Sequence, residues 1–302
     1  MTTHKRPRLL GAALMVASVL FFVVMNSLTK YSSAPAAEKV FVRMLIGVFT
    51  VFAFVRAGWV RMEFNNVPLL ALRGLLGAFA VMFYFDSIDH TTLGRAVFFQ
   101  FTYPAWGALF SYIFLKESLG WKRLPGLLIT FAGGYMILAS GGAVTLDGMT
   151  RGDISGVLCG LFSGAAVTTI RACHRYDATY MIFLFFASFG TLAGALFTFP
   201  GHFVEPTRMG WLVLACIGVT GTVAQLFFTQ SYRYLDVAAA GSMATLQAPL
   251  SALMGWIFFR EEFGAYALAG GLLVIAGGVF LALTSRGETL TRPELAAAPP
   301  SE

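Results

Sequence analysis

The sequence places ionisable side chains inside long apolar segments, where they are the first candidates for chemistry. Arg43 lies within the apolar segment 35–56, and Glu38 precedes it in the same segment. A charge is costly to bury among apolar residues, so such a residue is usually functional or paired. Because a guanidinium binds a carboxylate through two parallel hydrogen bonds, Arg43 is a candidate anchor for a bound carboxylate. The alternative is an internal ion pair with Glu38 or Asp86, and the sequence favours neither.

Acidic residues near the ends of these segments could carry protons or gate a pathway. Desolvation would raise the pKa of Glu38 and suit it to proton coupling; the alternative is an interfacial acid in partial contact with water. Asp86, Asp89 and His90 crowd one end of the apolar segment 67–88. They form either a solvated loop or a gate, so Glu38 and Asp86 are the candidates for coupling or gating.

One face of the apolar segment 92–115 carries polar side chains. Gln100, Tyr103 and Gly107 recur at spacings of three and four residues, which places them on one side of a helix. Amide and phenol groups there suit a cavity that hydrogen-bonds a polar solute, whereas Gly107 could instead serve helix packing. The corresponding residues of segment 237–259 are Thr245, Ala248 and Ala252. Further residues that could line such a cavity are Asn26, Tyr84, Trp106, Thr168, Gln225, Gln230 and Gln247.

Each of these two segments also contains a proline, Pro104 in one and Pro249 in the other. A proline removes a backbone hydrogen bond from a helix and frees a carbonyl group. We therefore expect both prolines to mark bends at which the helices hinge when the site closes.

Other common kinds of site have no support in the sequence. Cys159, Cys173 and Cys216 lie in or beside apolar segments without metal-ligand spacing, as buried small hydrophobic residues do. The four histidines are scattered near expected loops. A glycine-rich loop followed by Lys and Ser or Thr, which ATP binding would require, is absent from the sequence. We therefore predict no catalytic residues, no metal site and no cofactor.

The composition is that of an integral membrane protein. Hydrophobic residues make up 57% and charged residues 12% of the 302 residues, and the mean hydropathy is +0.74. These values leave too little polar surface for a soluble globule. The net charge of +6 comes from short gaps between apolar runs, so it does not form the continuous basic face that nucleic acid requires. The 30 phenylalanines either face lipid or stack on a flat ligand.

Apolar runs of membrane-spanning length follow one another along the chain. Their approximate bounds are 9–30, 35–56, 67–88, 92–115, 122–140, 152–171, 178–199, 209–232, 237–259 and 265–284. The first run is too long for the apolar part of a signal peptide, so we expect it to be a retained span.

The chain also contains an internal duplication. An offset of 145 residues places Pro104 on Pro249, and an offset of 144 places Gly77 on Gly221. Each repeat holds five spans, an odd number, so the second repeat crosses the membrane in the inverted orientation. The sequence therefore predicts an all-α integral membrane protein with ten transmembrane helices in two inverted five-helix repeats. The predicted organisation is a cytoplasmic N-terminus 1–8, a first repeat 9–140, a periplasmic linker 141–151, a second repeat 152–285 and a disordered cytoplasmic tail 286–302.

The distribution of basic residues predicts the orientation. Most of the 21 lysines and arginines flank helix ends on the side of the N-terminus, which places both termini in the cytoplasm. Asp147 in the linker then faces outward from the inner membrane. Inverted repeats are typical of carriers, because two similar halves can expose one central site alternately to each side. A channel would more often show a ring of charges or a filter sequence, and the sequence has neither.

A set of motifs recurs in a characteristic order. They are Glu38-x4-Arg43, Leu72-Arg73-Gly74, Pro104 followed by Leu115-Lys116-Glu117, Gly126, Gly133-Gly134, Pro249, Glu262, Gly271 and Gly277-Gly278. With these motifs the span from Leu9 to Thr284 resembles the EamA-type carriers of the drug/metabolite transporter superfamily. The resemblance implies a basket-like bundle with a central cavity and with peripheral fifth and tenth helices. Segment 181–190 departs from the pattern, because it carries no charge where the first repeat has Glu38 and Arg43.

The residues and the resemblance together predict a secondary transporter that moves a small polar or zwitterionic metabolite across the cytoplasmic membrane by alternating access. Members of the family export amino acids, aromatic metabolites and opine-type metallophores, so export of an amino-acid-like solute or such a metallophore is expected. Uptake of riboflavin or S-adenosylmethionine is the first alternative. A membrane-embedded enzyme is the second, although only Glu38, Asp86 and His90 approach the acids it would need. The expected partners are a small-molecule solute and the lipid bilayer, without nucleic acid, and a homodimer is compatible with the sequence.

Overall fold

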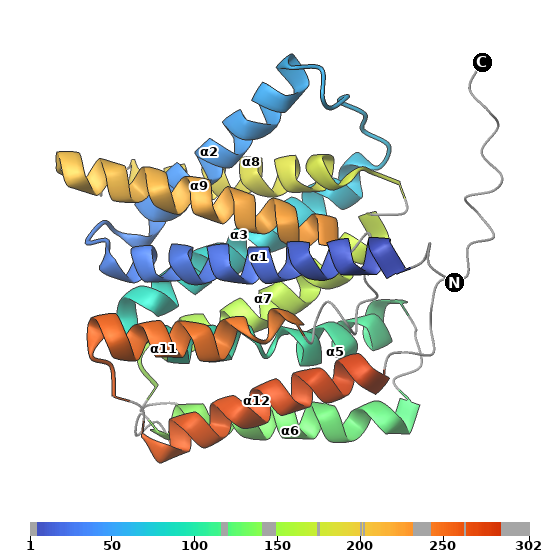
Figure 1. Cartoon of the computed structure of the whole chain (residues 1–302), viewed down its shortest axis with the longest axis vertical. Coiled ribbons are helices and arrows are strands. Elements are labelled where there is room, and N and C mark those ends of the chain that lie inside the picture. The colour runs from blue at the N-terminus through green and yellow to red at the C-terminus, as the bar shows by residue number, and fades with distance from the viewer. Residues whose placement is uncertain are drawn as a thin grey trace.

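A computed structural model describes residues 5–115, 120–140, 149–173, 176–199, 201, 203–231, 243–262 and 264–284, which form a bundle of helices (Figure 1). The helices are α1 (Lys5–Tyr31), α2 (Ala36–Arg56), α3 (Val67–His90), α4 (Leu93–Gln100), α5 (Tyr103–Leu115), α6 (Gly120–Ser140), α7 (Arg151–Cys173), α8 (Thr179–Thr198), α9 (Arg208–Ser231), α11 (Gln247–Phe259) and α12 (Ala265–Thr284). Asp147 with most of the predicted linker, residues 237–242 and the tail 286–302 lie outside the described residues.

Several helices have the length and composition of membrane spans. Among the described residues, five helices are long and apolar enough to cross a membrane: α1, α3, α7, α8 and α9. Large apolar side chains also cover the outside of the bundle, where Phe49, Trp256 and Phe258 are 63–68% exposed. Such a surface is suited to lipid, and helices satisfy their own backbone hydrogen bonds there. The protein is therefore an all-α multi-pass membrane protein.

The helices pack in pairs, and the internal duplication relates each pair either to another pair or to itself. α3 packs along α7, while its counterpart α9 packs along α1, the counterpart of α7. α2 packs on its own counterpart α8, and α6 packs on α12. Contacts of Lys30 with Thr91 and of Arg151 with Asp86 bring the end of α1, the end of α3 and the start of α7 to the same end of the bundle. Since α1 ends where α7 begins, the two halves are inverted and interleaved (Figure 1).

Close glycine packing holds α6 against α12 at the lower edge of the bundle in Figure 1. A Cβ atom at Gly133 would lie 2.6 Å from the carbonyl oxygen of Gly270, and a Cβ at Gly270 would lie 2.7 Å from that of Gly133. Only residues without side chains permit such an approach, which is typical of helix pairs in membranes. The pair is peripheral, as the resemblance implied.

The fourth span is interrupted next to Pro104, in the segment 92–115 where the sequence predicts a bend. α4 ends at Gln100 and α5 begins at Tyr103, and the intervening Thr102 N–H donates to the Phe99 carbonyl at 3.1 Å in a tighter turn. Pro104 therefore occupies the first turn of α5, where its missing N–H costs little, and not the middle of a helix. A similar tight turn precedes α11, where the Leu246 N–H donates to the Met243 carbonyl at 3.2 Å. Pro249 then lies in the first turn of α11.

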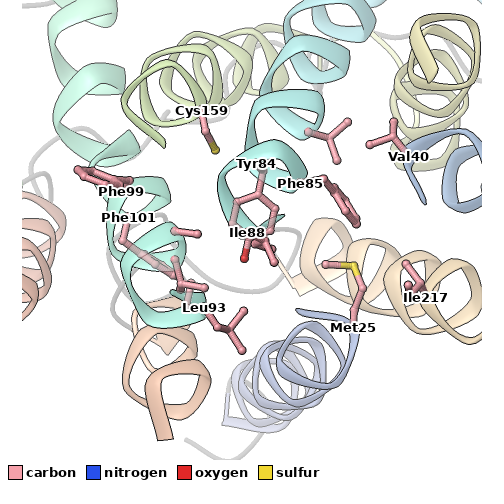
Figure 2. Close-up of a cluster of buried hydrophobic side chains, with 14 of the residues drawn as sticks. Met25, Val40, Tyr84, Phe85, Ile88, Leu93, Phe99, Phe101, Cys159 and Ile217 are labelled. Atoms are coloured by element: carbon pink, nitrogen blue, oxygen red, sulfur yellow. The ribbon is translucent and has the colours of Figure 1, made fainter. Parts of the chain in front are cut away.

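The buried core joins both halves near the centre of the bundle. Figure 2 shows Tyr84, Phe85 and Ile88 of α3 beside Met25 of α1 and Ile217 of α9. These five side chains are each at most 3% exposed. The core thus fixes α3, which carries several residues of the site, against helices of both repeats.

Candidate functional site

A cavity of about 120 Å³ lies between the two halves, where the breaks before α5 and α11 meet α1, α3, α7 and α9. Its polar lining consists of Arg43, Arg73, Tyr84, Gln100, Tyr103, Ser163, Gln225 and Gln247. Its apolar lining consists of Phe22, Met25, Gly77, Ala80, Val81, Phe101, Ala166, Val167, Ile170, Phe186, Phe228 and Ala244. None of these described residues is acidic, so the cavity has a positive lining.

Most of the predicted solute-binding residues meet at this cavity. Those that line it are Arg43, Tyr84, Gln100, Tyr103, Gln225 and Gln247. They come from α2, α3, α4, α5, α9 and α11, so the site exists only when both repeats are assembled. The helix breaks make this possible, because they bring residues of α4, α5 and α11 to one level of the bundle.

The other three predicted residues lie outside the lining. The Asn26 amide donates to the Ser251 hydroxyl at 3.3 Å. Trp106 packs on Phe131, with the two ring centroids 5.0 Å apart. Thr245 is buried beside Ala244, which does line the cavity.

The small residues on the predicted polar face serve packing. The Thr168 hydroxyl donates to the Gly107 carbonyl at 3.3 Å and to the Gly164 carbonyl at 3.0 Å. This contact fixes α5 against α7, and Gly107 is not among the residues that line the cavity, which agrees with the packing alternative for that residue.

Arg43 is buried without an acidic partner. Its side chain is 5% exposed, and its guanidinium lies 5.4 Å from the centroid of the Phe85 ring. Neither predicted ion pair forms: Glu38 accepts from the Val204 N–H at 3.4 Å, and Asp86 pairs with Arg151 at 2.7 Å. Among the described residues, no carboxylate neutralises Arg43, which leaves the guanidinium available to a solute.

Glu38 itself differs from its expected environment. Its exposed fraction is 0%, so of the two alternatives the interfacial acid in partial contact with water is wrong, and the carboxylate is desolvated. The contact with Val204 draws the loop before α9 over the start of α2 and excludes water from the carboxylate.

Arg73 is a site residue that the sequence analysis did not single out. It is 5% exposed, lines the same cavity as Arg43, and stacks on Phe186 with 4.8 Å between guanidinium carbon and ring centroid. Its Nε and Nη1 atoms are buried without a hydrogen-bond partner. The signal was present, since Arg73 lies inside the apolar segment 67–88, but positive residues near helix ends were counted as flanking charges.

Neutral polar atoms in and beside the cavity are also unsatisfied. The Tyr84 hydroxyl lies beside the amides of Asn26 and Gln247 without the geometry of a full hydrogen bond. The Gln100 Oε1 atom is likewise buried without a partner among the described residues. Because buried polar groups are normally hydrogen-bonded, these atoms are ready to bind water or a solute.

Ion pairs close one end of the bundle, which we call the charged end and define by Lys30, Lys39, Asp89 and Glu261. Lys39 pairs with Asp89 and donates to the Thr29 carbonyl at 3.0 Å. Lys30 donates to the Ile88 carbonyl at 3.1 Å and lies 3.6 Å from Glu261. Lys39 is only 1% exposed, so it belongs to this buried cluster although it lies in the first turn of α2.

Glu261 joins the two halves at the charged end. Its carboxylate oxygens accept from the Leu93 N–H at 2.8 and 2.9 Å, at the start of α4. A helix N-terminus carries partial positive charge and unsatisfied N–H groups, so a carboxylate is favourable there. A residue that follows α11 therefore caps a helix of the other repeat.

The acidic residues at the end of α3 are part of this closure. Asp86 pairs with Arg151 and accepts from the Ser155 hydroxyl at 2.5 Å, and Asp89 pairs with Lys39. They occupy the last turns of a helix, so the expectation of a solvated loop is wrong. Arg95 and Asp153 add a further pair at 2.8 Å between α4 and α7.

An interleaved pair of inverted helical repeats around a polar cavity defines a membrane carrier. The sequence comparison agrees, because the EamA-like transporter family matches over residues 9–139 and again over residues 150–283. The protein belongs to this family and is a metabolite transporter.

Individual relatives are similar over nearly the whole chain. A pseudopaline exporter of Pseudomonas aeruginosa is 29% identical over 92% of this chain and 97% of its own. A riboflavin transporter of Rhizobium johnstonii is 23% identical over 90% of each chain. One crystal structure superposes with a TM-score of 0.62 at 17% identity, covering 94% of this chain and 100% of the other, which shows the shared fold.

Proposed function

We propose that the protein is a secondary carrier that exports a small polar metabolite across the cytoplasmic membrane, and that Arg43 binds a carboxylate of this solute. The observation that carries the proposal is the unpaired Arg43 guanidinium in a cavity between two inverted halves. A planar guanidinium recognises a carboxylate through two hydrogen bonds. The amides of Gln100, Gln225 and Gln247 supply donors and acceptors for the remaining polar groups of a zwitterionic solute.

The charged end supports a specific state of the transport cycle. The positive-inside rule favours an orientation in which this end faces the periplasm and both termini face the cytoplasm. The Lys39–Asp89 and Lys30–Glu261 ion pairs then close the outer side. The cavity lining extends to Ile170 and Phe228, which lie within a turn of the opposite helix ends. We infer that this conformation accepts solute from the cytoplasm, as the first step of alternating access.

Export is favoured by the relatives that carry the name pseudopaline exporter. An amino-acid-like solute, including one of the opine metallophore type, fits an arginine surrounded by amides. All the named relatives are transporters, which supports transport without enzymatic activity. A homodimer in the inner membrane remains part of the proposal.

Transport of riboflavin is the second candidate. Relatives named as riboflavin transporters favour it, and Phe22, Phe101 and Phe186 line the cavity, where a flat ring could stack. A neutral ring, however, would leave the Arg43 and Arg73 charges uncompensated. A solute with a carboxylate therefore accounts better for the arginines in the cavity lining than riboflavin does.

The direction and the solute can be tested by comparing metabolites inside and outside cells of a deletion strain with those of the same strain carrying the gene. We expect a carboxylate-bearing compound to accumulate inside the deletion strain and to appear in the medium when the gene is restored. Depletion inside the deletion strain would instead indicate uptake, and an unchanged distribution of all metabolites would contradict the proposed transport.

A further inference from the structure

Two buried guanidinium groups face one cavity, and this pair carries an inference beyond a single carboxylate anchor. Arg43 and Arg73 are each 5% exposed and come from neighbouring helices of the first repeat. Among the described residues, neither side chain forms an ion pair, and no acidic residue lines the cavity. The cavity therefore holds two positive charges whose counter-charges are not supplied by the described protein.

Such an arrangement is costly in the absence of a ligand. A buried unpaired charge is strongly unfavourable, and two like charges repel each other in addition. Stacking on Phe85 and Phe186 offsets only part of this cost. A bound anion would remove the penalty, because it supplies both the charge and the hydrogen-bond acceptors that the guanidinium groups lack.

Two glycines related by the internal duplication leave room for the two guanidinium groups. A Cβ atom at Gly77 would overlap the Nη1 atom of Arg73, and a Cβ at Gly221 would lie 2.6 Å from the Nε atom of Arg43. Gly77 and Gly221 correspond at the offset of 144 residues. Each half thus has one glycine on its third helix that leaves space for a side chain, and an arginine side chain fills each space.

The different positions of the two guanidinium groups along α3 favour two anionic groups over one. The Arg73 guanidinium lies at the level of Gly77 on α3, whereas that of Arg43 stacks on Phe85 of the same helix. Phe85 follows Gly77 by eight residues, or roughly 12 Å along the helix axis, so the two guanidinium groups contact different levels of α3. Two guanidinium groups at different levels of the cavity are best neutralised by two anionic groups, one at each level.

We propose that the solute carries two separate carboxylates, one bound by Arg43 and the other by Arg73, with its middle portion beside Gln100 and Tyr103. The assignment rests on the proposed function, since it names the solute class of the same cavity. Arg73 is then a specificity-determining residue that selects dianionic over monoanionic solutes.

The proposal is tested by thermal unfolding of the purified full-length protein in detergent at constant ionic strength. The probes are glutarate, adipate and suberate, with hexanoate as the monocarboxylate and inorganic phosphate as the compact dianion. We expect at least one dicarboxylate to raise Tm clearly more than hexanoate or phosphate does. We also expect Arg73→Gln and Arg43→Gln each to need at least a tenfold higher concentration of this dicarboxylate for the same rise in Tm.

Unfolding without ligand provides a control for structural damage. Neither arginine has an acidic partner, so Arg43→Gln and Arg73→Gln should retain or increase the Tm of the wild-type protein. Arg95→Gln is the matched control, because it removes the partner of the fully buried Asp153 and should lower Tm.

The outcomes separate this inference from the proposed function. If Arg43→Gln abolishes binding while Arg73→Gln binds every dicarboxylate as the wild type does, the two-carboxylate solute is rejected and the single anchor remains. Equal stabilisation by hexanoate and all dicarboxylates, or stabilisation by none of the probes, also rejects it. Failure of the proposed function is read separately, from an unchanged metabolite distribution in the deletion strain.

Discussion

Gly221 illustrates how single residues determine the chemistry of the cavity. It stands on α9 where the Arg43 side chain crosses from α2, and its lack of a side chain gives the guanidinium its place. A glycine in a helix interior costs up to about 1 kcal/mol relative to alanine. The sequence thus accepts a weaker helix at a position where only a glycine leaves room for the arginine.

Replacing Gly221 by alanine should therefore weaken solute binding without unfolding the protein. The new Cβ would lie 2.6 Å from Arg43 Nε and 2.8 Å from Met25 Sδ, so both side chains must move. We expect about a tenfold loss of affinity, which corresponds to about 1.4 kcal/mol, in a ligand-dependent Tm assay. Gly134→Ala is the control, because its nearest new contact is an ordinary 3.7 Å to Thr102 Cγ2; equal losses in both variants would refute this role of Gly221.

At the scale of elements, α4 connects the cavity to the charged end. Its first N–H groups are capped by Thr92 and by Glu261, and its last residue, Gln100, lines the cavity. A motion that opened the charged end would have to release Glu261 from Leu93 and would shift Gln100. The short helix created by the break is thus suited to link gating with solute binding.

Neutralising Glu261 should favour opening of the charged end. Glu261→Gln retains an acceptor for the Leu93 N–H but loses the charge near Lys30. A charge-assisted hydrogen bond exceeds a neutral one by about 1 kcal/mol, which shifts a two-state population about fivefold. A cysteine at Ser87, which is 0% exposed, should then react several times faster with an impermeant thiol reagent added outside the cells or spheroplasts.

The labelling experiment needs a background in which Cys159, Cys173 and Cys216 are replaced by serine. Glu262→Gln is the matched control, because Glu262 is the exposed neighbour of Glu261. Unchanged labelling in Glu261→Gln would remove the gating role of this residue. Labelling only from the cytoplasmic side would invert the proposed orientation.

The architecture of the whole molecule was largely predictable because the sequence contains two similar repeats. The offset that superposes Pro104 on Pro249 predicted two repeats, and the odd number of spans in each predicted their inversion; the packing of α3 on α7 and of α9 on α1 has that symmetry. Periodicity placed Gln100 and Tyr103 on one face, and both line the cavity. These signals are local or repeated, so a single sequence contains them.

The long-range pairing of charges could not be predicted in the same way. Lys39 and Arg73 looked like flanking charges because counting basic residues does not reveal how far a side chain is buried. Glu261 pairs with Leu93 across 168 residues, and no spacing rule connects them. Pro104 predicted a bend in the fourth span but not that α4 ends at Gln100 and a new helix begins at Tyr103, since a proline is compatible with either a kink or a helix start.

At the scale of the whole protein, the proposed function requires that both halves enclose a site in which Arg43 holds a carboxylate of the transported solute. The most direct measurement is the affinity of purified wild type, Arg43→Lys and Arg43→Gln for the metabolite whose distribution changes in the deletion strain. Lysine keeps the charge but loses the planar fork, so we expect at least a tenfold weaker affinity in Arg43→Lys and no detectable binding in Arg43→Gln, with Tm maintained in both. Wild-type affinity in Arg43→Gln would contradict the account.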